Sequence, residues 1–129
     1  MPDGLVAVSL IALALLSPVA PADAWLEHSI TYWADMYGLD PACFRELAYR
    51  ESKLDPRALG GKGERGLYQF KPGTWEWAAS RVGVDADFDA AYNPWLNARV
   101  AAGLLSHYQG KYDSWWSAYP GCGCEVRVG

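Results

Sequence analysis

Glycines and prolines divide the chain from residue 25 to residue 110 into short segments of helical length, and this punctuation constrains the fold more than any other feature. In the first segment apolar side chains recur at the 3.6-residue spacing of a helix, and Gly38 stands where a helix ends. Asp40 and Pro41 then form an N-cap followed by proline at the first helical position, while Asp55-Pro56 disfavours helical geometry. The pattern predicts helices from about 25 to 37 and from 41 to about 52.

Two further helices follow from the same signals. Thr74 is placed to cap a third helix that ends near Gly83. Asn93-Pro94 starts a fourth, which stops near residue 110 and carries His107 on its apolar face as a core histidine. A short last helix around residues 114–116 is also predicted.

The segment between the second and third helices is rich in glycine. Residues 60–66 predict a flexible turn, and residues 67–70 form at most a small strand or extended segment. Lys62 is followed by Gly63 rather than by Ser or Thr, so this segment is not a phosphate-binding loop. The fold is therefore expected to be mainly α with at most a small β-hairpin, and a length of 129 residues allows one compact domain.

Composition narrows the possible partners. The formal net charge is −4 and the pI is near 5.0, so the broad basic face that phosphate binding requires is missing and no nucleic acid partner is expected. The hydrophobic content of 51% excludes a disordered chain. Aromatic residues make up 14% of the sequence, more than so small a core needs, which places some rings on a binding surface. Trp33 is expected in the core, and Trp75 and Trp77 on different faces of one helix.

The N-terminus predicts export. An apolar run of 12 residues from Leu5 to Leu16 fits a signal-peptide core better than a membrane-spanning helix of about 20 residues. Ala22-Asp23-Ala24 supplies a small-x-small cleavage site. We expect residues 1–24 to be a signal peptide, or an N-terminal anchor since Lys and Arg are missing before the run, and residues 25–129 to be a periplasmic or extracellular domain.

Three cysteines allow at most one intrachain disulfide. A bridge between Cys122 and Cys124 would close too small a ring for ordinary disulfide geometry, so Cys43 is expected to pair with one of them. The alternative is three reduced thiols. A zinc site is disfavoured because His28 and His107 lack a paired spacing, and no metal or other cofactor is expected.

One carboxylate interrupts an apolar stripe. On the second helix Phe44, Leu47 and Ala48 share a face, and the next position on that face is Glu51. Desolvation of a carboxyl group raises its pKa, which is how a general acid is made; a value of roughly 6 is typical of such glutamates. The alternative is an ordinary helix-end carboxylate paired with a neighbouring Lys or Arg.

Three separated blocks around this residue resemble the soluble (SLT) type of lytic transglycosylase, a member of the lysozyme-like superfamily that cleaves peptidoglycan. The resemblance covers roughly residues 38–119, and the blocks occur in the family's order. They are Glu51-Ser52-x-x-Asp55-Pro56-x-Ala58, Gly66-Leu67-Tyr68-Gln69-x-x-Pro72-x-Thr74-Trp75 and Asn93-Pro94-x-x-Asn97-x-x-x-Ala101.

The resemblance implies a lysozyme-like fold and assigns roles to five residues. Glu51 is the expected catalytic acid, and Ser52 and Gln69 the expected substrate contacts. Tyr68 stands where the family usually has Met, and Tyr119 matches the Tyr of the family's Ala-Tyr-Asn although Pro follows it here. The alternatives are that Gln69 caps a turn and that Tyr119 is a core ring. Further rings are candidates for stacking on sugars: Trp95, Trp115 and Trp116.

The implied chemistry needs one carboxyl group. Cleavage of a β-1,4 glycosidic bond requires a proton for the leaving oxygen and usually a second carboxylate. Lytic transglycosylases instead use the N-acetyl group and 6-hydroxyl of the substrate, so the product is a 1,6-anhydro sugar. No second carboxylate stands out, Asp55 being expected to brace a turn and residues 85–89 to form a solvated loop.

The sequence thus predicts an exported peptidoglycan lytic transglycosylase that acts on glycan strands, most simply as a monomer, with roles in secretion, conjugation or phage assembly left open. One alternative is a muramidase that releases reducing ends. The other is a catalytically silent cell-wall-binding or assembly module on the same scaffold.

Overall fold

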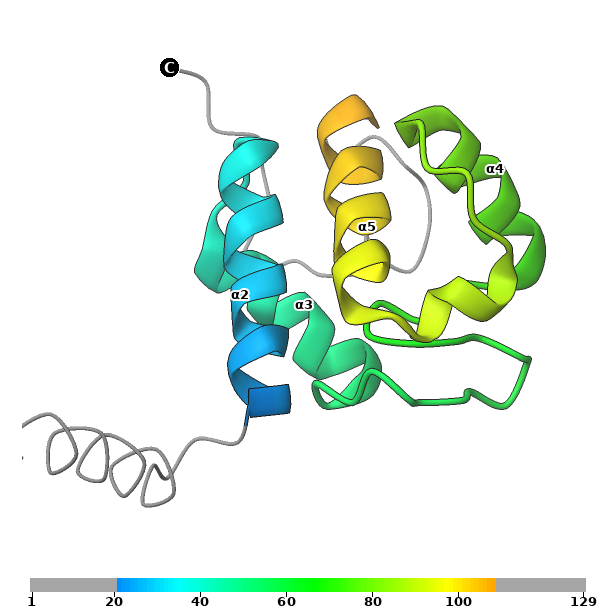
Figure 1. Cartoon of the computed structure of the whole chain (residues 1–129), viewed down its shortest axis with the longest axis horizontal. Helices are drawn as coiled ribbons and strands as arrows, with labels where there is room; N and C mark the ends of the chain where they lie inside the picture. The colour runs from blue at the N-terminus through cyan, green and yellow to red at the C-terminus, as the bar shows by residue number, and fades with distance from the viewer. Residues whose placement is uncertain (1–20, 109–129) are drawn as a thin grey trace, which may run out of the picture.

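The computed structural model describes residues 21–108, and regular structure in this range is almost entirely helical (Figure 1). The α-helices are α2 (Pro21–Met36), α3 (Pro41–Ser52), α4 (Pro72–Val82) and α5 (Pro94–Tyr108), and a 3-10 helix, η1 (Phe88–Tyr92), precedes α5. Isolated antiparallel bridges join Arg65 to Leu59 and to Phe70. The prediction of a mainly α fold with at most a small β element is confirmed.

The bounds of α3 agree with the prediction because both ends are encoded locally. The Asp40 carboxylate accepts hydrogen bonds from the backbone N–H groups of Ala42 and Cys43, at 2.9 and 3.1 Å, and Pro41 is the first helical residue. The helix ends at Ser52, and Lys53 caps it in the left-handed conformation. α3 therefore presents Glu51 in its last turn.

One predicted helix end and one predicted burial are wrong. α4 begins at Pro72 rather than after Thr74, because the fixed φ of proline starts the helix two residues earlier, and Lys71 takes the cap position. His107, in the last turn of α5, is exposed rather than a core histidine. The expected stop near residue 110 and the short last helix lie outside the described residues.

The expected solvated loop at residues 85–89 contains the start of η1. The Asp87 side chain accepts a hydrogen bond from the backbone N–H of Asp89 at 3.1 Å and so caps this short helix. Asn93 then accepts a hydrogen bond from the N–H of Leu96 at 3.2 Å, as expected of the residue that starts α5.

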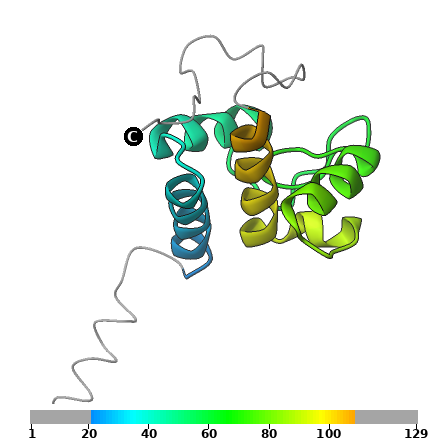
Figure 2. The ribbon, with the colours of Figure 1, turned by 90° about the horizontal axis from the view of Figure 1, so that it is seen from above.

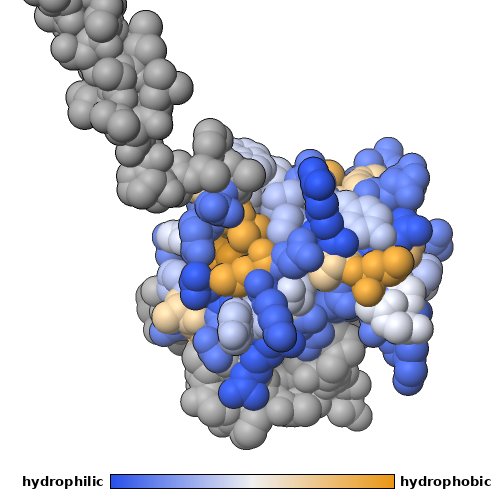
Figure 3. All heavy atoms as spheres, turned by 90° about the horizontal axis from the view of Figure 1, so that it is seen from below, coloured by the Kyte–Doolittle hydropathy of each residue, from blue (hydrophilic) through white to orange (hydrophobic). Residues whose placement is uncertain are grey.

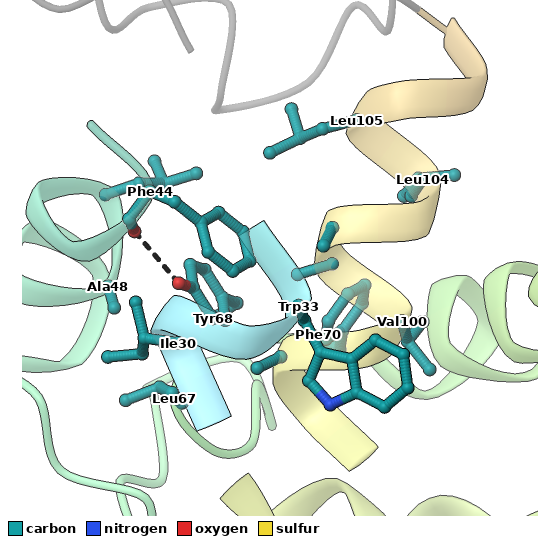
Figure 4. Close-up of a cluster of buried hydrophobic side chains, with 14 of the residues drawn as sticks. Ile30, Trp33, Phe44, Ala48, Leu67, Tyr68, Phe70, Val100, Leu104 and Leu105 are labelled. Atoms are coloured by element: carbon teal, nitrogen blue, oxygen red, sulfur yellow. Dashed lines mark hydrogen bonds between the residues drawn. The ribbon is translucent and has the colours of Figure 1, made fainter. Parts of the chain in front are cut away.

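The core lies where α2, α3, α5 and residues 67–70 meet (Figure 4). α2 packs on α3 and α5, and α4 packs on the other side of α5 (Figures 1 and 2). Trp33 is in the core as predicted, and Trp75 is buried whereas Trp77 is half-buried. Each large apolar side chain buried here contributes roughly 1.5 to 3 kcal/mol. None of the described helices is long and apolar enough to span a membrane.

Candidate active site

Glu51 is the penultimate residue of α3 and is half-buried. The preceding residues of its face, Phe44, Leu47 and Ala48, are buried in the core. After Ser52 the backbone turns away through two consecutive left-handed residues, with φ of 55° at Lys53 and 62° at Leu54. Such residues cost roughly 1 to 2 kcal/mol each when they carry a side chain, so the surrounding structure must hold this turn in place. The turn leaves the Glu51 carboxyl at the edge of the core.

The Glu51 carboxyl group is adapted to hold a proton near neutral pH. Burial, and secondly the negative charge of Glu64, raise its pKa to about 7. Within residues 21–108 no cation forms an ion pair with it: the guanidinium of Arg50 lies 3.8 Å from Glu46 instead. Glu51 is therefore not the paired helix-end carboxylate considered above. A carboxyl group with this pKa can both donate and accept a proton at physiological pH.

Ser52 connects the end of α3 to the segment that carries Gln69. Its hydroxyl lies 2.8 Å from the carbonyl oxygen of Leu67 and 3.1 Å from that of Ala48, both as acceptors. Its partners are backbone groups, so Ser52 positions the two parts of the site relative to each other. Its predicted contact with substrate stays a prediction.

Tyr68 lies in the core. Its side chain is 0% exposed, its hydroxyl donates to the carbonyl oxygen of Phe44 at 2.9 Å, and its ring stacks on Phe44 with centroids 4.4 Å apart (Figure 4). The structure thus gives Tyr68 a packing role between α3 and the segment at 67–70. It offers a sugar no exposed surface in this conformation.

The Gln69 carboxamide braces the glycine-rich loop. Gln69 is 7% exposed, has a φ of 54°, and its Nε2 donates to the carbonyl oxygens of Ala58 and Gly66 at 3.2 and 3.0 Å. The two hydrogen bonds of Nε2 agree with the alternative that the Gln69 side chain caps a turn. Its Oε1 faces Gly60, where a Cβ atom would stand only 2.6 Å away. The oxygen is the atom left for a ligand, and its contact with substrate remains a prediction.

Glu64 is a second carboxylate at this site that the sequence reasoning missed. A Cβ atom at Gly60 would stand 3.0 Å from its carboxyl carbon, so Gly60 leaves room for the Glu64 and Gln69 head groups together. The N–H of Lys62 donates to Glu64 Oε1 at 2.7 Å and holds the carboxylate in the loop. The bridges from Arg65 to Leu59 and Phe70 fold this loop back on itself, and no signal in the sequence marked Glu64.

Asn97 is a second residue whose importance only the structure reveals. It is 0% exposed, its Oδ1 accepts a hydrogen bond from the N–H of Tyr68 at 2.9 Å, and its Nδ2 donates to the carbonyl oxygen of Ala91 at 2.8 Å. A buried amide with both ends satisfied fixes its neighbours strongly. Asn97 thereby holds η1, α5 and the Gln69 segment together. A polar residue on the apolar face of a predicted helix was the signal.

Of the remaining predicted residues, some lie outside residues 21–108 and others within them. Tyr119, Cys122, Cys124, Trp115 and Trp116 lie outside the described residues. Cys43 is buried on α3 and disulfide-bonded, but its pairing with Cys122 or Cys124 stays a prediction. Asp55 braces the turn as expected, since its carboxylate accepts a hydrogen bond from the N–H of Arg57 at 2.9 Å. Among the described residues no cluster of side chains suited to a metal ion occurs.

The raised pKa of Glu51 predicts that Glu51→Gln stabilises the fold at alkaline pH. The unfolded carboxyl loses its proton near pH 4.5 and the folded one near 7, so wild-type stability falls as pH rises through this window. With a discount for partial exposure, the gain in the variant above pH 7 is of order 1 kcal/mol. Urea unfolding at pH 4 and pH 8 measures it: the gain should vanish at pH 4. The exposed Glu46→Gln variant is the control, and an equal gain at both pH values would contradict the prediction.

Within residues 21–108 these features define a class: a mainly α domain in which the half-buried carboxyl group of Glu51 forms no ion pair, has a raised pKa suited to general acid–base chemistry, and lies near a braced amide. Residues 28–121 match the family described as Transglycosylase SLT domain. The match covers more than half of the chain, so the chain belongs to the SLT transglycosylase domain family, as the three sequence blocks predicted. Its fold is the lysozyme-like fold of that family, and its family-level function relates to peptidoglycan. Comparison with curated proteins and with solved structures gave no match.

Proposed function

We propose that the chain is an active peptidoglycan lytic transglycosylase in which Glu51 is the sole acid and base. It cleaves the β-1,4 bond between MurNAc and GlcNAc and leaves a 1,6-anhydro-MurNAc end. The observation that carries the proposal is the Glu51 carboxyl in the last turn of α3, which has a pKa of about 7 and no ion pair within residues 21–108. A binding module would not need a carboxyl group desolvated at a cost to stability.

One carboxyl group suffices for the proposed reaction. Protonated Glu51 gives its proton to the glycosidic oxygen as the bond to C1 breaks, while the carbonyl oxygen of the N-acetyl group bonds to C1. Glu51, now ionised, accepts the proton of the 6-hydroxyl as that oxygen attacks C1 and displaces the N-acetyl oxygen. A pKa near 7 suits a group that must both give and take a proton.

Mass spectrometry of the muropeptides released from purified cell-wall sacculi tests the proposal. We expect anhydro-MurNAc ends from the wild-type chain and no release by Glu51→Gln. Reducing MurNAc ends would indicate the muramidase alternative. The absence of any product, from a chain shown by circular dichroism to be folded, would indicate a silent wall-binding or assembly module.

Glu64 favours the muramidase as the second candidate. Its carboxylate lies beside Gln69 and raises the pKa of Glu51 through its charge, so a second carboxylate is present after all. Such a group can activate a water molecule or stabilise the oxocarbenium-like centre. If it does, hydrolysis competes with formation of the anhydro ring.

Glu64→Gln separates the two candidates. Loss of its charge lowers the Glu51 pKa, so the alkaline limb of the pH–activity profile should move to lower pH, but not to that of a free glutamate because burial is the larger cause. For a transglycosylase the anhydro product should stay the same. A fall in reducing ends relative to anhydro ends would show that Glu64 supports hydrolysis. Glu46→Gln is the matched control, and an unmoved alkaline limb in Glu64→Gln would contradict the coupling.

Export of the domain is also proposed, supported by the apolar run from Leu5 to Leu16 and the small residues at 22–24. Peptidoglycan lies outside the cytoplasm, so the family's substrate is consistent with this location. Fractionation of cells that produce the chain, with N-terminal sequencing of the product, distinguishes a cleaved signal from a retained anchor.

A further inference from the structure

Exposed and half-buried aromatic rings gather where the first three turns of α2 meet the first turn of α5. The ring of Trp25, 47% exposed, stacks on that of Trp95 with centroids 5.1 Å apart and an interplanar angle of 19°. His28 also stacks on Trp95, at 5.8 Å, and Tyr32, 38% exposed, lies 4.9 Å from it. We call these four residues, with Trp33 and Arg99 beneath them, the aromatic face.

Two buried donors beneath the rings have no acceptor among the described residues. Trp33 is 9% exposed, and neither its Nε1 nor the buried Nε of Arg99 has a hydrogen-bond partner within residues 21–108. The two groups adjoin, since the guanidinium carbon of Arg99 lies 5.2 Å from the Trp33 ring centroid. Unpaired buried donors are rare because each loses its hydration without compensation. A ligand that enters between the rings above these donors could supply the missing acceptor, and an anionic oxygen is the acceptor that a guanidinium binds most strongly.

Arg99 also has no counter-ion within residues 21–108. The ion pairs of the described region use Arg45, Arg50 and Arg65, and none includes Arg99. On α4, Arg81 lies over the Trp77 ring at the same distance of 5.2 Å, but Arg81 is solvent-exposed. Arg99 thus differs from Arg81 in being half-buried, and hydration compensates less for its missing anionic partner.

The aromatic face lies apart from the catalytic carboxyl. Seen from above, the beginnings of α2 and α5 lie on the side of the domain away from α3, whose last turn carries Glu51 (Figure 2). From below, the surface of the described residues shows hydrophobic areas bordered by hydrophilic residues (Figure 3). A ligand on the aromatic face would therefore not occupy the site of bond cleavage.

We propose that the aromatic face is a second binding site, which takes a peptidoglycan strand through the apolar faces of its sugar rings and a carboxylate of its stem peptide. Flat indole and phenol rings suit pyranose rings, and the unpaired guanidinium of Arg99 suits a carboxylate. The choice of peptidoglycan rests on the proposed function. The site would hold the enzyme on the wall between cleavage events.

Co-sedimentation with purified sacculi tests the site, with Glu51→Gln as the background so that the wall stays intact. Intact sacculi are compared with sacculi from which an amidase has removed the stem peptides. Trp25→Ala should weaken binding to both by roughly fivefold or more, with Trp25→Phe restoring much of it. Arg99→Gln should weaken binding to intact sacculi by roughly tenfold, as loss of a charged hydrogen bond does, and leave stripped sacculi unaffected. Arg81→Gln and Met36→Ala, which alter an exposed cation–π pair and an exposed apolar side chain, are the matched controls.

Three results would overturn the inference. The first is that Trp25→Ala and Arg99→Gln bind sacculi as strongly as the control variants do. The second is that Arg99→Gln loses as much binding to stripped sacculi as to intact sacculi. The third is a Trp25→Ala loss confined to phospholipid vesicles, which would make the face a membrane contact. Cleavage is measured separately in chains that keep Glu51, with short soluble glycans that the face cannot retain. Absence of cleavage there would count against the proposed function alone, and unchanged binding of the face variants against this inference alone.

Discussion

Glu51→Gln is expected to lower the rate of peptidoglycan cleavage by roughly 10² to 10⁴ or more, because the amide can neither donate nor accept the proton that the reaction transfers. The side chain is nearly isosteric and Glu51 has no ion pair within residues 21–108, so the fold should be kept. In the wild-type chain, activity should fall on the alkaline side with an apparent pKa of about 7, the value at which Glu51 loses its proton. Release of muropeptides from sacculi, measured from pH 4 to pH 9, provides both readouts.

The matched control is Glu46→Gln, an exposed carboxylate on the same helix that pairs with Arg50. Its activity and pH profile should be those of the wild-type chain. More than about a tenth of wild-type activity in Glu51→Gln would refute the assignment of the catalytic acid. An alkaline limb near pH 4 alone would show that the Glu51 carboxyl is solvated.

Gly66→Ala is expected to destabilise the fold by about 4 kcal/mol or more, an unusually large loss for one methyl group. Gly66 has a φ of 82°, and a Cβ atom there would stand 2.1 Å from the carbonyl oxygen of Ala91 and 2.5 Å from Asn97 Nδ2. Ala91 and Asn97 are joined by a buried hydrogen bond, and Asn97 also binds the backbone of Tyr68 beside Gln69. Neither neighbour can therefore move away without breaking hydrogen bonds. Urea unfolding measures the loss of free energy, and cleavage should fall along with it.

Gly83→Ala is the control that measures backbone strain without the steric clash expected at Gly66. Gly83 has an almost identical φ of 83°, yet a Cβ atom there meets nothing within 4 Å. This variant should therefore cost only the roughly 1 to 2 kcal/mol of a left-handed residue with a side chain. Equal losses in the two variants would mean that the approach of η1 and α5 to Gly66 is not what requires glycine.

The helical architecture could be predicted because its signals are local. Asp40 and Pro41 start α3, Asn93 starts α5, and Gly83 ends α4, each through hydrogen bonds or dihedral angles within a few residues. The misplaced start of α4 has the same origin, since two local signals, Pro72 and Thr74, competed for one helix start. The family could also be predicted, because three separated sequence blocks specify it more strongly than any single residue does.

The arrangement of the site was only partly predictable. The position of Glu51 on an apolar face followed from helical spacing, and its raised pKa from the burial that this position implies. The effect of Glu64 could not be predicted, because it depends on how the glycine-rich loop folds back over Gly60. The unpaired donors of Trp33 and Arg99 likewise depend on the packing of α2 against α5, since neither residue is near the other in the sequence.

By itself, then, the sequence determined the order and ends of most helices, the family and the position of Glu51 at the end of a buried helix face, since these depend on neighbours along the chain and on helical spacing. Only the tertiary structure decided that Tyr68 is a core residue, that the nitrogen of Gln69 is used within the loop, and that Asn97 holds three segments together. The physical reason is that a polar side chain forms hydrogen bonds with the groups that lie within about 3 Å of it in the folded chain, whatever their separation in sequence. Loop closure brings together groups such as Tyr68 and Asn97, 29 residues apart, and no local signal encodes that meeting.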